Sequence, residues 1–150
     1  MRIGVISDTH DLVRPEALAA LKRSELILHA GDVCSAEVLE ILERIAPVVA
    51  VRGNNDRGGW ARALPASRTL EVSGYRIHIV HDLKDLEGDA REFHAVVSGH
   101  SHEPGVRRED GVLFLNPGSA GPRRFKLPVA VARLSAAKAG LCARIVELAI

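Results

Sequence analysis

The first third of the chain alternates short apolar runs with helical patterns, and this order constrains the fold more than any other feature. Residues 2–7, 25–30 and 47–53 have the length and apolar character of strands, whereas residues 15–24 and 35–46 repeat apolar side chains at helical spacing. Two parallel strands need a crossover of a dozen or more residues, which a helix usually supplies. The order therefore predicts a parallel β-α-β-α-β unit.

The second half is typical of hairpins. Residues 68–81, 105–116 and 129–148 each read as two strands, with turns at Ser73-Gly74, at Asp110-Gly111 and near Ala139-Gly140. Residues 94–99 form one further run of the kind found in buried strands. We expect this half to be mostly antiparallel, so that mixed sheets pack together and are covered by helices.

Composition limits the classes of function. A chain of 150 residues fits one domain, residues 1–150. A net charge of +1 and an aromatic content of 3% disfavour specific nucleic-acid binding and base-stacking platforms. No apolar run approaches the roughly 20 residues that span a bilayer, and Met1 leads directly into a strand-like segment. We expect a cytoplasmic protein without membrane contact, in which Cys34 and Cys142 form no disulfide framework.

Polar groups that can bind metals follow five predicted strands. They are Asp8-Thr9-His10, Gly31-Asp32, Gly53-Asn54-Asn55-Asp56, His81-Asp82 and Gly99-His100-Ser101-His102. Loops at the carboxyl ends of strands converge in open α/β sheets, so these groups should share one rim. Oxygen and imidazole ligands without sulfur favour manganese, iron or zinc. Two carboxylates, four imidazoles and one amide exceed the needs of one ion and indicate a two-metal centre.

A serine hydrolase is an alternative interpretation of one of these segments. Residues 99–103, GHSHE, approach the nucleophile elbow G-x-S-x-G, with Ser101 as the nucleophile. Glu103 stands where the elbow needs glycine, and a serine mechanism gives no reason for Asp8, Asp32 or Asn54.

Two further histidines are expected outside the rim. His29 lies on a predicted buried strand and should be a core residue with satisfied hydrogen bonds, lying behind the rim residues. His78 should share the exposed face of its hairpin with Arg76.

The motifs at the five strand ends, in this order, resemble the calcineurin-like metallophosphoesterases. The likeness is to their small single-domain branch, which includes compact phosphodiesterases and the related retromer subunit. It runs from Met1 to about Ser119 and includes the segment Asn116-Pro117-Gly118-Ser119. The resemblance implies an α/β fold, a four-layer αββα sandwich of two mixed β-sheets flanked by helices.

The resemblance also implies a ligand set for two divalent ions. It assigns Asp8, His10 and His102 to one ion, Asn54, His81 and His100 to the other, and Asp32 to both. The candidate catalytic residues are Asp32, Asn54, Asn55 and Asp56. Mn²⁺ is the first expectation, with Ni²⁺, Fe²⁺, Zn²⁺ and Mg²⁺ as alternatives. The implied reaction is hydrolysis of a small phosphodiester by a metal-bridging hydroxide, which attacks in line with the leaving group.

The chain departs from the family pattern at two positions. Larger members carry a histidine after the metal-binding asparagine, where it can protonate the leaving group, but this chain has Asn55. Asp82 follows His81 where the family usually has glycine, and its carboxylate could act behind the ligands. These departures keep a second function open, a non-catalytic interaction scaffold that retains the fold. Self-association into a homo-oligomer is also left open.

Arg123 and Arg124 follow the Asn116-Pro117-Gly118-Ser119 turn. Either could bind a substrate phosphate, because a guanidinium offers paired donors to phosphate oxygens. A solvated pair of charges is the simpler interpretation.

Overall fold

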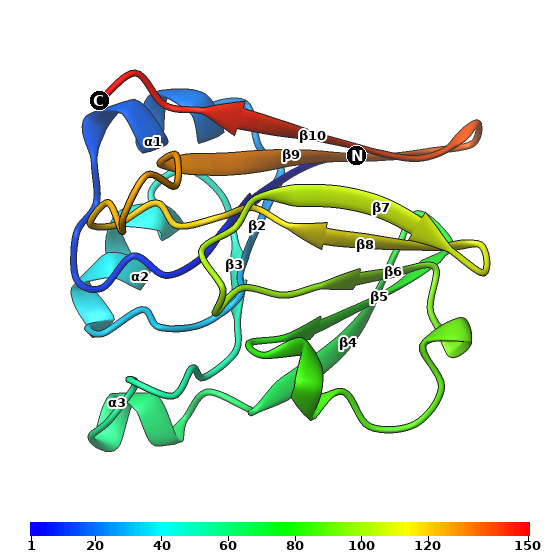
Figure 1. Ribbon diagram of the computed structural model, residues 1–150, viewed down its shortest axis with the longest axis horizontal. Helices are drawn as coiled ribbons and strands as arrows, with labels where there is room; N and C mark the ends of the chain where they lie inside the picture. The colour runs from blue at the N-terminus through cyan, green and yellow to red at the C-terminus, as the bar shows by residue number, and fades with distance from the viewer.

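Two five-stranded sheets form the body of the protein in a computed structural model that describes residues 1–150 (Figure 1). The first sheet contains β1 (Arg2–Ile6), β2 (Leu26–His29), β3 (Val48–Ala50), β9 (Ala130–Ala137) and β10 (Gly140–Glu147), in the order β10-β9-β1-β2-β3. The second contains β4 (Ser67–Val72), β5 (Tyr75–Val80), β6 (Ala95–Val97), β7 (Gly105–Glu109) and β8 (Val112–Asn116), in the order β4-β5-β6-β8-β7.

The predicted β-α-β-α-β unit is confirmed in the first sheet. β1 pairs with β2, and β2 with β3, both in parallel. Between them lie α1 (Pro15–Leu21) and α2 (Ala36–Glu43), which pack on the outer face of the sheet. Both helices are shorter than predicted. α1 ends early because the chain must turn at once to the sheet, where the N–H of Glu25 already bonds to the carbonyl of Arg2.

The centre of the second sheet differs from the expected antiparallel arrangement. All three predicted hairpins form, but β6 pairs in parallel with both β5 and β8. Residues 81–94 and 98–111 are each long enough to be the crossover that parallel neighbours need. Because β7 lies at the sheet edge, it does not separate β6 from β8.

The four predicted layers are present, although the fourth is thin. A core of 16 buried residues fills the space between the sheets, including Val5, Leu28, Ile77 and Leu113. The outer face of the second sheet is covered only by two short 3₁₀ helices, η1 (Leu83–Asp85) and η2 (Ala90–Glu92), and their flanking residues. The remaining helix, α3 (Gly59–Arg62), follows β3. None of the helices has the length and apolar character that crossing a bilayer requires.

The prediction that His78 is exposed was wrong. Only 9% of this residue is exposed, because Phe93 stacks on the imidazole with ring centroids 4.5 Å apart and an interplanar angle of 16°. The Thr69 hydroxyl lies 2.8 Å from His78 Nδ1. Arg76 lies over the Phe93 ring, so the face expected to meet solvent is covered by the end of the β5–β6 crossover.

His29 is a fully buried core residue with hydrogen bonds at both ring nitrogens. The N–H of Gly31 donates to Nδ1 at 3.1 Å, so the ring proton must be on Nε2. Nε2 lies 3.1 Å from Thr9 Oγ1, and that hydroxyl donates to the Val33 carbonyl at 3.1 Å. Burial lowers the pKa of His29 to about 4, with partial opposition from nearby carboxylates. The network has no place for a second ring proton.

Protonation of His29 should therefore oppose folding. The neutral His29 ring contributes its full stabilisation of the folded state above its ordinary pKa of 6.5. This contribution is lost as the pH falls toward 4, because His29 takes up a proton in the unfolded chain before it does so in the folded protein. The loss should reach about 3 kcal/mol for a shift of this size. We expect urea unfolding of the chelator-treated protein to show this decrease between pH 7 and pH 4, and to show a smaller one for His29→Gln. Equal pH dependence in the two proteins would contradict the assignment.

Gly99 lies where the second sheet meets the end of β1. A Cβ at this position would overlap Ser7 Oγ and lie 2.6 Å from Asp8 Oδ2. Overpacking of this kind typically costs about 1–3 kcal/mol, so Gly99→Ala should lower the free energy of unfolding by that amount. Gly105→Ala is the control, because a Cβ there meets nothing within 4 Å. If the two variants have the same free energy of unfolding in urea, the contact of Gly99 with Ser7 and Asp8 is loosely packed.

Candidate metal centre

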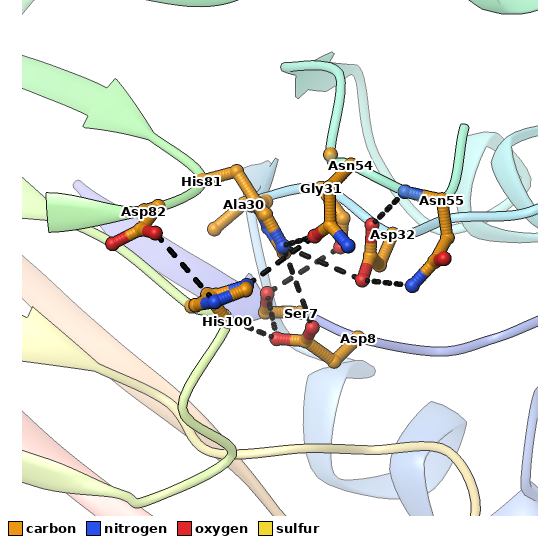
Figure 2. Close-up of polar contacts among 12 residues, drawn as sticks. Ser7, Asp8, Ala30, Gly31, Asp32, Asn54, Asn55, His81, Asp82 and His100 are labelled. Atoms are coloured by element: carbon orange, nitrogen blue, oxygen red, sulfur yellow. Dashed lines mark hydrogen bonds and ion pairs between the residues drawn. The ribbon is translucent and has the colours of Figure 1, made fainter. Parts of the chain in front are cut away.

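The seven candidate ligands lie at one rim, where strands of both sheets end. Figure 2 shows five of them, Asp8, Asp32, Asn54, His81 and His100, and the His10 and His102 imidazoles lie beside Asp8. Asp8 and His10 follow β1, Asp32 follows β2, Asn54 follows β3, His81 follows β5, and His100 and His102 follow β6. Backbone hydrogen bonds join these ends. Gly99 N donates to the His81 carbonyl at 2.9 Å, and His100 N donates to Asp8 Oδ2 at 3.0 Å. The expected convergence of loops therefore includes both sheets.

Asp8 is the fully buried centre of the arrangement. Its Oδ2 accepts hydrogen bonds from the Ser7 hydroxyl at 2.7 Å and from His100 N. Its Oδ1 has no hydrogen-bond partner. This atom faces three imidazole Nε2 atoms, at 3.3 Å from His102 and 3.8 Å from His10 and His81.

Asp32 lies between two of the same imidazoles. Its Oδ2 is 3.4 Å from His81 Nε2 and 3.7 Å from His10 Nε2. Asn55 holds the carboxylate from the other side, with its backbone N–H on Oδ1 at 2.8 Å and its amide Nδ2 on Oδ2 at 2.9 Å (Figure 2). Asn55 thus fixes the orientation of Asp32.

Asn54 lies between His81 and His100. Its Oδ1 lies 3.0 Å from His81 Nε2 and 3.3 Å from His100 Nδ1. The other nitrogen of His81, Nδ1, is 2.7 Å from the Ala30 carbonyl, which can only accept a hydrogen bond, so Nδ1 carries a proton and donates it to this bond. His81 Nε2 is therefore the nitrogen presented to the rim. His100 is more exposed, and its Nε2 lies 3.5 Å from Asp82 Oδ2.

The two carboxylates and the imidazoles shift one another's pKa. Burial raises the pKa of Asp8, but the His102 ring, the Ser7 hydroxyl and His81 together move it below its ordinary value. Burial likewise raises the pKa of Asp32, but His81 and Asn55 outweigh it and the net pKa is lowered. Burial lowers the pKa of His81, whereas the two carboxylates raise it to about 8.

For His10, burial lowers the pKa and outweighs the carboxylates. Both carboxylates are ionised at neutral pH, so the rim offers anionic oxygens among imidazoles.

This donor set fits divalent ions. Asp8, His10 and His102 form one group with ligand atoms within 4.8 Å of one another, and Asp8, Asp32 and His81 form a second. Buried polar atoms normally have partners, but Asp8 Oδ1 and His10 Nε2 have none within the protein. A cation between these atoms would satisfy both. The first group contains three of the four ligands implied for the first ion. Beside the second group, Asn54 Oδ1 lies 3.0 Å from His81 Nε2, as the resemblance implied for the other ion.

The backbone around the candidate ligands is unusual. Five of them have φ between 46° and 70°, in the left-handed region that residues other than glycine rarely adopt. They are Asp8, His10, Asp32, His100 and His102. Strain of this kind gathers at functional sites, where the surroundings hold a side chain in a required direction.

Two predicted residues have other surroundings. The carboxylate oxygens of Asp56 accept from the backbone N–H groups of Cys34 and Gly53, both at 2.8 Å, so Asp56 secures the loop that carries Asn54. Ser101 Oγ accepts from Asn116 Nδ2 at 3.1 Å and from Glu103 N at 3.2 Å. These bonds make Ser101 part of a turn, with no imidazole bonded to its hydroxyl.

Sequence reasoning missed two serines that support Asp8. Ser7 donates to its carboxylate, and the Ser119 hydroxyl donates to its backbone carbonyl at 3.0 Å. Ser7 could have been suspected because it directly precedes Asp8, and Ser119 because it ends the Asn116-Pro117-Gly118-Ser119 motif.

Comparisons with known proteins agree with the geometry. Residues 1–139 match the family model of the calcineurin-like phosphoesterase superfamily domain. A probable metallophosphoesterase of Methanothermobacter thermautotrophicus is 39% identical over 153 residues, which cover 92% of this chain and 88% of the relative.

Solved structures share the fold. An archaeal phosphodiesterase has a TM-score of 0.80 and 25% identity, covering 97% of this chain and all of its own. Vps29 of Entamoeba histolytica, solved in complex with Zn²⁺, has a TM-score of 0.74 and 21% identity, covering 98% of this chain and 99% of its own. The family match and the 39% identical relative from Methanothermobacter thermautotrophicus show that this chain belongs to the calcineurin-like phosphoesterase superfamily.

Proposed function

We propose that residues 1–150 form one catalytic domain, a metal-dependent phosphodiesterase that hydrolyses small phosphoester substrates at a centre of two divalent ions, with Mn²⁺ as the first candidate. The observation that carries the proposal is Asp8 Oδ1, a buried anionic atom without a hydrogen bond that faces three imidazole nitrogens. The Asp32 carboxylate and the Asn54 amide oxygen both lie beside His81 Nε2, one of these nitrogens, and oxygen donors of this kind suit hard divalent ions.

When bound, two divalent ions supply positive charge for the phosphate oxygens and lower the pKa of coordinated water. The residues of the chain set the geometry. Asp32 lies between His10 and His81 and is the candidate to contact both ions, while Asn55 keeps its carboxylate turned to the rim. The Ala30 carbonyl fixes the His81 tautomer, as carbonyl partners of metal-binding histidines commonly do.

An interaction scaffold that retains this fold is the competing function. The Vps29 structures share the architecture, and Asn55 and Asp82 depart from the catalytic pattern of the family. The complete set of candidate ligands favours catalysis, because a scaffold has no need for ionised carboxylates held among imidazoles in strained backbone.

Removal of metal should abolish activity, and its return should restore it. We expect no hydrolysis of bis(4-nitrophenyl) phosphate after chelator treatment, and recovery when Mn²⁺, Ni²⁺, Zn²⁺ or Mg²⁺ is added back. Asp32→Ala should remove both the activity and the metal uptake, measured by calorimetry, because both ions lose a ligand. Ser101→Ala is the control and should retain most of the activity. If none of the added metals restores hydrolysis, the result would favour the scaffold. If Ser101→Ala loses activity while Asp32→Ala keeps it, the result would favour a serine nucleophile.

The acidity of the leaving group should strongly affect the rate of hydrolysis. An amide cannot act as a general acid at neutral pH, and Asn55 is already bonded to Asp32, so the departing oxygen must leave without a proton from this position. Aryl phosphodiesters should therefore be hydrolysed at least about 100-fold faster than alkyl ones, since a general acid typically contributes about 10²–10⁴-fold.

The measurement is a series of phosphodiesters whose leaving groups differ in pKa, with hydrolysis in buffer alone as the control for their intrinsic reactivity. Equal rates on nitrophenyl and alkyl esters would mean that another group supplies the proton.

A further inference from the structure

A basic loop with an exposed aromatic tip lies between β8 and β9. We call residues 121–128 the tip loop. It carries Phe125, which is 91% exposed, whereas the other exposed large apolar residues lie between 37% and 49%. Of the two other phenylalanines, Phe93 is buried and Phe114 is partly buried. An isolated exposed side chain needs no explanation by itself, but this one stands beside Arg123, Arg124 and Lys126.

The beginning of the tip loop is attached to the segment that carries Asp8. Ala120 N donates to the Ser7 carbonyl at 3.1 Å, and the Ser119 hydroxyl donates to the Asp8 carbonyl. A Cβ on Gly121 would overlap the Thr9 carbonyl oxygen, so the chain touches the candidate centre at this point. Figure 1 shows the loop (gold to orange) beside the segment that leaves β1 (dark blue). The tip loop thus begins at the rim itself.

The return of the chain is fixed in the same place. Ala130 N donates to the Ser119 carbonyl at 3.0 Å, so the loop leaves and re-enters the fold at one point. Arg14 adds a further bond, from its guanidinium to the Gly121 carbonyl at 3.2 Å. The base of the loop is therefore held by hydrogen bonds, and residues 122–126 are exposed to solvent.

The tip is cationic without acidic partners. No Asp or Glu occurs between Asp110 and Glu147 in the sequence, and the loop cations make no ion pair. Arg123 and Arg124 follow Gly121 by two and three residues, and the Gly121 backbone meets the Asp8 and Thr9 carbonyls. A guanidinium at this distance along the chain can reach a substrate anion at the candidate centre.

A defined turn presents Phe125 to solvent. Its φ of 51° lies in the left-handed region, which is unfavourable for a bulky side chain, and Leu127 N closes the turn on the Arg124 carbonyl at 3.0 Å. A backbone conformation that costs free energy and leaves an aromatic ring in water gives no stability to the fold. Such an outlier, on a loop that begins beside the Asp8 segment, points to contact with a ligand.

We propose that Phe125 stacks on an aromatic ring of the substrate while Arg124 contacts the phosphate, so that the substrate class is a small phosphodiester with one nucleobase or aryl group. This inference rests on the proposed phosphodiesterase function. A single exposed ring suits one base of a small molecule, not the successive bases of a nucleic-acid strand, which need several aromatic platforms.

The test separates ring binding from leaving-group chemistry. The two substrates are the 4-nitrophenyl ester of thymidine 5′-phosphate and methyl 4-nitrophenyl phosphate, which release the same phenol and differ in the group that remains. Base stacking on an aromatic side chain corresponds to roughly 5- to 150-fold per base. For a ring as exposed as this one we expect Phe125→Ala to lower kcat/KM on the thymidine ester about tenfold and to leave the methyl ester within about twofold, in Mn²⁺-loaded protein.

Phe125→Tyr keeps the ring and should retain the preference for the thymidine ester. Arg124→Gln should lower kcat/KM on both esters, because both carry the phosphate. Binding of thymidine 5′-phosphate, measured by calorimetry on the same variants, provides a readout without turnover and should weaken about tenfold in Phe125→Ala.

Three results would overturn the inference. One is an unchanged ratio of the two kcat/KM values in Phe125→Ala. Another is unchanged binding of thymidine 5′-phosphate. The third is a Phe125→Ala variant whose sedimentation coefficient changes while its preference for the thymidine ester does not, which would make the Phe125 ring a self-association surface. Metal-restored hydrolysis of the methyl ester alongside any of these would leave the proposed function standing, whereas its absence would count against that function directly.

Discussion

The buried carboxylate of Asp8 is the constraint on which the rest of the rim depends. An ionised group removed from water costs several kcal/mol unless charges and hydrogen bonds replace its hydration. The fold supplies them from distant segments, with Ser7 beside it, His100 N from the second sheet, and three imidazoles facing Oδ1. The two sheets must therefore end at one point, and Gly99 without a side chain allows that approach.

The same requirement explains the glycines that precede the candidate ligands. A Cβ on Gly53 would overlap the Asp32 carboxylate, and one on Gly31 would lie 2.7 Å from His81 Nδ1. Glycine–aspartate, glycine–asparagine and glycine–histidine pairs thus combine close approach with a ligand in the next residue. The left-handed conformations of Asp8, Asp32 and His100 are the cost of turning each chain sharply at the end of its strand.

Local signals in the sequence predicted much of this arrangement, and long-range contacts account for what they missed. Strand ends and residue types were enough to bring seven candidate ligands to one rim, because the end of a strand fixes where the next residue lies. The parallel pairing of β6 and the burial of His78 depend on the path of a crossover and on Phe93, which periodicity within a strand cannot reveal. The hydrogen bond from Ser119 to the Asp8 carbonyl spans 111 residues, so only the place of Ser119 at the end of the Asn116-Pro117-Gly118-Ser119 motif could have pointed to it.

Asn55 shows how one position can exchange one role for another. A histidine there could protonate a leaving group, whereas the asparagine amide adds a side-chain hydrogen bond to the one that the backbone N–H already gives Asp32, whose carboxylate lies between His10 and His81. Under the proposed function, this exchange gives a well-positioned centre without a proton donor for the departing oxygen, so esters with acidic leaving groups should react fastest. Discrimination among such esters would then come from the part of the substrate that remains. The tip loop is attached to the Asp8 segment and carries both a ring and cations, which is where such discrimination would be exerted.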